Sequence, residues 1–150
     1  MNARRRQQVP ATRKSPAPSI KLAGLLWVGP LTVLTTMAAV LVVRLIAVAL
    51  LHPPPAFAPL GLDSVAVLTA MLITCAVLVF VLVVLFASTP IRIFHVIAIG
   101  ALLLSFVPDL MVPSSHSPGA NWPNAVALMV LHVTAWAVCV TMLTKLTRSD

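Results

Sequence analysis

Hydrophobic residues occur in four long runs, which short polar or proline-rich segments separate. The first run, residues 22–51, contains one charged residue, Arg44. A helix rises about 1.5 Å per residue and bilayer hydrocarbon is about 30 Å thick, so such a run is long enough to cross a membrane. The pattern predicts an all-α protein, a four-helix transmembrane bundle. The expected helices cover residues 20–51, 63–87, 90–111 and 122–146, within a transmembrane domain of residues 20–150.

Composition supports lipid, rather than water, as the solvent of this chain. Hydrophobic residues make up 60% of it and charged residues 9%, whereas soluble domains carry about 25% charged residues. The net charge of +7 is unevenly distributed. Residues 1–19 are basic and polar and cannot bury a core, so a disordered N-terminal tail is expected. Anionic lipids are its expected partner, and nucleic acid is not, because no recognition module accompanies the tail.

The distribution of basic residues also predicts the orientation of the chain. Apart from Arg44, the Lys and Arg residues lie in or next to the N-terminal tail, at Arg92 near the second connection, and at Lys145 and Arg148. The first and third connections carry none. Positive residues stay on the cytoplasmic side, so both termini are expected to be cytoplasmic in a multi-pass protein of the cell inner (plasma) membrane.

Each predicted helix has one face of small or polar residues at spacings of three and four. Small residues let helices approach closely in lipid, and hydroxyl groups find partners across the interface. We expect these faces to line the interior of the bundle. A transport path along the same interior is the alternative, and the stripes alone do not distinguish the two. The predicted packing residues are Gly29, Thr36, Ala66, Ala70, Ala98, Ser105 and Ala135.

Three ionisable residues within the predicted spans are candidates for a polar cluster. Counting from the inner basic residues places Arg44, Asp109 and His132 about 34, 25 and 20 Å above the inner face. Side chains lean toward the N-terminus of their helix, which brings these three groups toward one another. Because a charge in the bilayer is costly, it usually faces a partner or a cavity. The sequence therefore predicts an intramembrane cluster in the outer half of the bundle.

Three interpretations of this cluster remain open at the level of sequence. A salt bridge could fix the first helix against the third, with His132 hydrogen-bonded nearby. Asp109 and His132 could instead form a site that binds a proton or a ligand. Arg44 could also extend alone to the lipid head groups.

Other polar residues are expected to have local roles. Asp63 is a plausible N-cap of the second helix. Cys75 and Cys139 are expected at depths that differ by about 9 Å, too far apart for a disulfide, so both are expected to be small buried residues. His52 and His116 belong to no metal-binding spacing motif. No metal or cofactor is therefore expected.

Three short motifs resemble a family of small four-span bacterial membrane proteins catalogued as a domain of unknown function. They are Leu26-Trp27-Val28-Gly29-Pro30, Ser105-Phe106-Val107-Pro108-Asp109-Leu110 and Leu131-His132-Val133. The resemblance covers nearly everything after the basic tail. It implies a four-helix membrane domain in bacteria and brings no activity or catalytic residue.

The motifs of enzymes are missing from the sequence, which has no nucleophile elbow, no zinc-protease motif and no phosphate-binding glycine loop. We therefore expect no enzyme. The expected function is structural or partner-binding, as an accessory protein that contacts a second copy or another membrane protein. The alternative is a small transporter or permease with a polar pocket in the outer half of the bundle.

Overall fold

The structure is a computed structural model that describes residues 22–146, with side chains from residue 26 onward. The predicted disordered tail therefore lies outside the described residues. The predicted fold class is confirmed, since four long helices make up most of the described chain. The helices are α1 (Leu22–Leu51), α2 (Leu62–Phe86), α3 (Pro90–Met111) and α4 (Trp122–Leu146). Short 3-10 turns follow α1 and α3: η1 (Ala58–Leu60) and η2 (Val112–Ser114).

All four helices are long and apolar enough to cross a membrane by length and composition. Much of their outer surface consists of exposed Leu, Val and Ile side chains, which lipid can solvate. The chain is therefore described as a multi-pass membrane protein.

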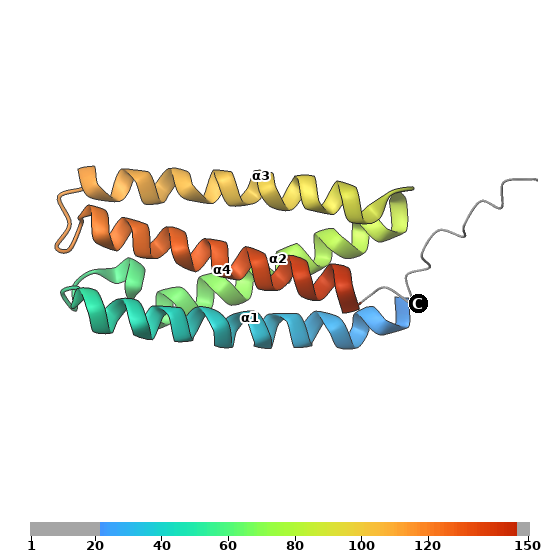
Figure 1. The fold of residues 1–150 in the computed structure, drawn as a ribbon, viewed down its shortest axis with the longest axis horizontal. Coiled ribbons are helices and arrows are strands. Elements are labelled where there is room, and N and C mark those ends of the chain that lie inside the picture. The colour runs from blue at the N-terminus through green and yellow to red at the C-terminus, as the bar shows by residue number, and fades with distance from the viewer. Residues whose placement is uncertain (1–21, 147–150) are drawn as a thin grey trace, which may run out of the picture.

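Helix α4 holds the bundle together. It packs against α1, α3 and, less extensively, α2, whereas α1 and α3 have little contact with each other. Figure 1 shows α4 between α1 and α3, with α2 crossing obliquely behind it. The burial of α4 matches this position, because its span is the most buried of the four.

The connections divide between the two ends of the bundle. The α1–α2 and α3–α4 connections lie together at one end, called here the loop end. The α2–α3 turn, the start of α1 and the end of α4 lie at the other, called here the turn end (Figure 1). Arg92 and Lys145, both exposed, belong to the turn end.

Two apolar clusters form the core. The cluster at the turn end contains Phe80 and Phe94, whose rings meet edge to face with centroids 4.8 Å apart. Leu143 and Val140 of α4 belong to it as well. The cluster at the loop end joins Val40, Phe57, Leu60, Val65, Leu128 and Leu131.

The predicted packing residues are more deeply buried on some helices than on others. Gly29 and Thr36 of α1 are buried, and Ala98 and Ser105 of α3 and Ala135 of α4 are half-buried. On α2, Ala66 and Ala70 are half-buried. The fully buried residues of α2 are Val65, Ile73 and Phe80.

The buried face of α2 is therefore rotated from the predicted stripe. Asp63 and Thr74, which share that stripe, are exposed. Since nearly all residues of α2 are apolar, small residues did not identify its inner face. Asp63 lies in the first turn of α2 rather than at its N-cap, which is Gly61. The expectation that Asp63 caps the helix is therefore corrected, although a carboxylate in the first turn still favours the helix dipole.

The loop end is closed by contact between its two connections. Gly119 has a φ of 82°, and a Cβ added there would lie 2.9 Å from Pro54 Cδ and 3.1 Å from Phe57 Cβ. Asn124 Nδ2 donates a hydrogen bond to the Gly119 carbonyl at 2.7 Å. Only glycine combines this backbone conformation with so close an approach.

Replacing Gly119 by Ala should destabilise the bundle by about 2 kcal/mol, because it adds left-handed strain and a steric clash. Gly100→Ala is the matched control. Gly100 is exposed within α3, and a Cβ there would meet nothing within 4 Å. In thermal melting in detergent, Gly119→Ala should melt at a lower temperature and Gly100→Ala at an equal or higher one. Equal melting of both variants would contradict this description of the loop end.

Candidate functional site

Asp109 and His132 form a polar pair between α3 and α4. His132 Nε2 lies 3.4 Å from Asp109 Oδ2. Asp109 is 5% exposed, while the His132 side chain is 31% exposed. Asp109 Oδ2 is buried and accepts no hydrogen bond within the described chain, so the contact is a close approach without hydrogen-bond alignment.

The opposite leans of these two side chains explain why they meet. Asp109 lies near the end of α3, and His132 lies well inside α4, which runs in the opposite direction. Each side chain leans toward the N-terminus of its own helix, so the two converge. As a carboxylate with an imidazolium, or as two neutral groups, the pair carries no net charge. It is therefore much less costly in hydrocarbon than a lone carboxylate.

Arg44 is bound elsewhere. Its Nε donates a hydrogen bond to the Leu60 carbonyl at 2.8 Å. Leu60 belongs to η1 and is 2% exposed, so this bond satisfies a buried carbonyl in the connection that follows α1. The guanidinium thereby ties the α1–α2 connection to α1.

The predicted three-residue cluster is corrected on this geometry. Within residues 22–146, no ion pair joins Arg44 to Asp109. A bridge of this kind needs α1 beside α3, but α4 lies between them. The heights estimated from the sequence do not show which helices are neighbours, so they could not reveal that α4 separates α1 from α3.

An apolar pocket adjoins the pair, with a volume of about 290 Å³. Its buried floor includes Ile73, Phe94, Cys139 and Val140. Its rim is formed by exposed residues of α2 and α3, namely Leu72, Cys75, Ile97 and Ala101. The pocket, called here the lateral pocket, therefore opens sideways between α2 and α3, toward the surrounding lipid.

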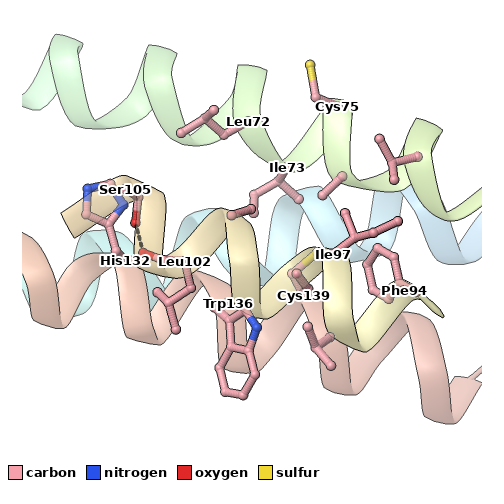
Figure 2. Close-up of a pocket in the computed structure, with 15 residues that line it drawn as sticks. Leu72, Ile73, Cys75, Phe94, Ile97, Leu102, Ser105, His132, Trp136 and Cys139 are labelled. Carbon is pink, nitrogen blue, oxygen red and sulfur yellow. Dashed lines mark hydrogen bonds between the residues drawn. The ribbon is translucent and has the colours of Figure 1, made fainter. Parts of the chain in front are cut away.

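His132 and Ser105 are grouped at one end of this pocket, and Phe94 lies toward the other (Figure 2). Ser105 Oγ donates to the Leu102 carbonyl at 2.7 Å. Trp136 also lines the pocket, and its Nε1 is buried without a hydrogen-bond partner in the described chain.

The cysteines differ in their surroundings. Cys139 is buried, as expected. Cys75 is exposed, which corrects the expectation for it, and its sulfur points away from the other labelled side chains (Figure 2). Both are free thiols. The described residues contain no group of three or more His, Cys, Asp or Glu residues that could hold a metal ion.

The sequence matches a known protein family. The model of DUF6069, described as a family of unknown function, matches residues 17–149. The chain belongs to this family. No protein with a curated description and no solved structure matches it.

Two functional features of this DUF6069 chain were missed by the sequence reasoning. The bond from Arg44 to Leu60 joins a side chain to a carbonyl, and a sequence pattern carries no signal for an acceptor in the backbone. Trp136 does carry a signal, because its indole N–H lies in the middle of an apolar span and needs a partner.

Replacing Arg44 by Met should loosen η1, because the buried Leu60 carbonyl loses its donor. Amide hydrogen exchange in Ala58–Leu60 should then accelerate about tenfold, equivalent to about 1.4 kcal/mol. Mass spectrometry of the detergent-solubilised protein measures this exchange. Arg92→Met, a change at the exposed residue near the opposite end, should leave η1 exchange unaltered. Unchanged exchange in the Arg44 variant would show that this bond does not hold η1.

Proposed function

We propose that this DUF6069 chain is an integral membrane protein with a structural or partner-binding role, acting as an accessory protein rather than as an enzyme or transporter. The geometry that supports this proposal is a bundle whose interior is tightly packed at the turn end. The fold brings together one polar pair and surrounds it mostly with apolar side chains.

The observation that carries the proposal is the packing between the pair and the turn end. Phe80, Phe94 and Leu143 are each at most 2% exposed and fill the bundle there. A hydrated path for an ion or a polar solute would have to pass through these side chains. A single chain in this conformation therefore favours packing over conduction.

In this proposal the Asp109–His132 pair contributes to specific packing. Polar contacts between helices in lipid contribute about 0.6 kcal/mol on average and up to about 2 kcal/mol. They also fix the register of the helices, because a misaligned polar group would face hydrocarbon. The pair would thus align α3 with α4, the helix on which the other three pack.

One observation favours the alternative, a small transporter or permease. His132 lines the lateral pocket while it contacts the buried Asp109, so a ligand in that pocket would reach a polar group. Carboxylates and histidines inside membranes often serve proton relays. Transport would then require a second conformation that opens the turn end.

Replacing Asp109 by Asn tests the two functions against each other. We expect this change to lower the free energy of unfolding by about 1 kcal/mol, because the contact with His132 loses its charge. The variant should therefore melt at a lower temperature in detergent. Proteoliposomes with either the unaltered chain or the variant should show no proton flux above that of empty vesicles. Asp63→Asn, at an exposed position, is the control and should lower the melting temperature less than Asp109→Asn does, because it removes only a favourable interaction with the helix dipole. Unchanged melting together with flux that the variant abolishes would support the transporter instead.

The proposed location is the inner (plasma) membrane, with both termini cytoplasmic. Arg92 and Lys145 at the turn end support this orientation, because basic residues remain on the cytoplasmic side. The expected partners are the bilayer itself, anionic lipids at the basic tail, and a second copy or another membrane protein.

Single cysteines introduced at the two ends test the orientation. With Cys75 and Cys139 replaced by Ala, Ser117→Cys probes the loop end and Ser88→Cys the turn end, and both positions are exposed. A membrane-impermeant maleimide added to spheroplasts should label Cys at 117 directly. It should label Cys at 88 only after the membrane is permeabilised. The reverse pattern would show that the termini face outward.

A further inference from the structure

We propose that the lateral pocket between α2 and α3 binds a membrane-dissolved alcohol or phenol with a long apolar body, whose hydroxyl group is held at the His132 end. This inference concerns a binding site and does not depend on whether the chain acts as an accessory protein. It rests on the shape of the pocket and on the polar atoms that line it.

The pocket suits an apolar body that arrives from the bilayer. Its volume of about 290 Å³ is near the lower end of the range for small-molecule sites. Three helices line it, and most of its lining side chains are aliphatic or aromatic. Because its rim is exposed between α2 and α3, a molecule dissolved in lipid could enter without crossing water.

The polar atoms of the pocket are gathered on a few residues and are incompletely satisfied. His132 Nε2 lies 3.4 Å from Asp109 Oδ2, and its Nδ1 makes no hydrogen bond among the described residues. Ser105 Oγ has used its hydrogen, so it can only accept a further bond. Trp136 Nε1 is a buried donor without a partner.

A second cavity of about 80 Å³, lined mainly by residues of α2 and α4, also borders His132. The imidazole therefore borders two cavities and is not enclosed by tight packing. A residue left half-exposed between cavities can accommodate a head group beside it with little rearrangement. This contrasts with the tightly packed rings of Phe80 and Phe94.

The inventory of donors and acceptors selects the chemistry of the head group. Ser105 Oγ is an acceptor and Trp136 Nε1 is a donor, while His132 Nδ1 donates or accepts according to the tautomer and charge of the imidazole. A hydroxyl group can both donate and accept a hydrogen bond, so it suits these atoms in either state of the imidazole. A carboxylate offers acceptors only and would place a negative charge near Asp109. An alkane would leave the polar atoms without partners.

Fluorescence of Trp136 gives a direct test, since this residue lines the pocket. Trp27 and Trp122 are 83% and 60% exposed, so replacing both by Phe should leave the fold intact and Trp136 as the only indole. The protein is reconstituted in phosphatidylcholine vesicles. Brominated stearyl alcohol, brominated octadecane or brominated stearic acid is then added as the quencher.

We expect saturable quenching by the alcohol. Its half-maximal mole fraction should be about fivefold lower than that of the alkane, as one net hydrogen bond predicts. The acid, added at alkaline pH so that its carboxyl group is ionised in the bilayer, should resemble the alkane or bind more weakly. Equal quenching by alcohol and alkane would overturn the proposal, as would tighter binding of the acid.

Two variants locate the binding. His132→Gln keeps an amide that can contact Asp109 but removes the imidazole, so the preference for alcohol over alkane should disappear. Ala101→Phe adds a ring at the exposed rim and should abolish saturable quenching. Val96→Phe adds similar bulk at an exposed position of α3 outside the pocket and should leave quenching unchanged. An alcohol preference that survives both His132→Gln and Ala101→Phe would overturn this assignment.

Discussion

The structure depends on the requirement that polar groups inside a bilayer find partners within the protein. Lipid offers no hydrogen bonds, so each buried polar atom must be satisfied by the chain or remain at a considerable cost in free energy. Thr32 satisfies its hydroxyl with the Val28 carbonyl, one turn earlier in α1. Arg44 donates a hydrogen bond to the Leu60 carbonyl, and Asp109 lies close to His132. The apolar residues fill the remaining space, while the bond of Arg44 holds the connection to α1 and the contact of Asp109 with His132 joins α3 to α4.

The same requirement explains why so much of the fold could be predicted from the sequence. Backbone groups in hydrocarbon must be paired within a helix, so a long apolar run has essentially one structural solution. Pro53 and Pro90 mark a helix end and a helix start that the sequence already indicated. The inner faces of α1 and α3 were also readable, because polar residues such as Thr36 and Asp109 would be costly against lipid.

The parts that could not be predicted depend on the arrangement of helices around one another. Nearly all residues of α2 are apolar, so its burial at Val65, Ile73 and Phe80 follows from packing and not from polarity. Arg44 and Asp109 were placed at compatible heights, but height gives no information about which helices are neighbours. The central position of α4 decides that question, since it separates α1 from α3. The partner of Arg44 is a backbone carbonyl, which every residue carries and no pattern singles out.

The oblique path of α2 links the packing to the candidate site. The large side chains Ile73 and Phe80 occupy the face of α2 that meets the other helices, and α2 crosses α4 at an angle (Figure 1). Helices that cross obliquely cannot remain in contact along their full length, so α2 and α3 separate away from their shared turn. The aromatic contact of Phe80 with Phe94 closes the bundle near that turn, whereas the lateral pocket lies where the separation leaves space. His132 is half-exposed for this reason, because α2 does not cover it as it covers the core at the turn end.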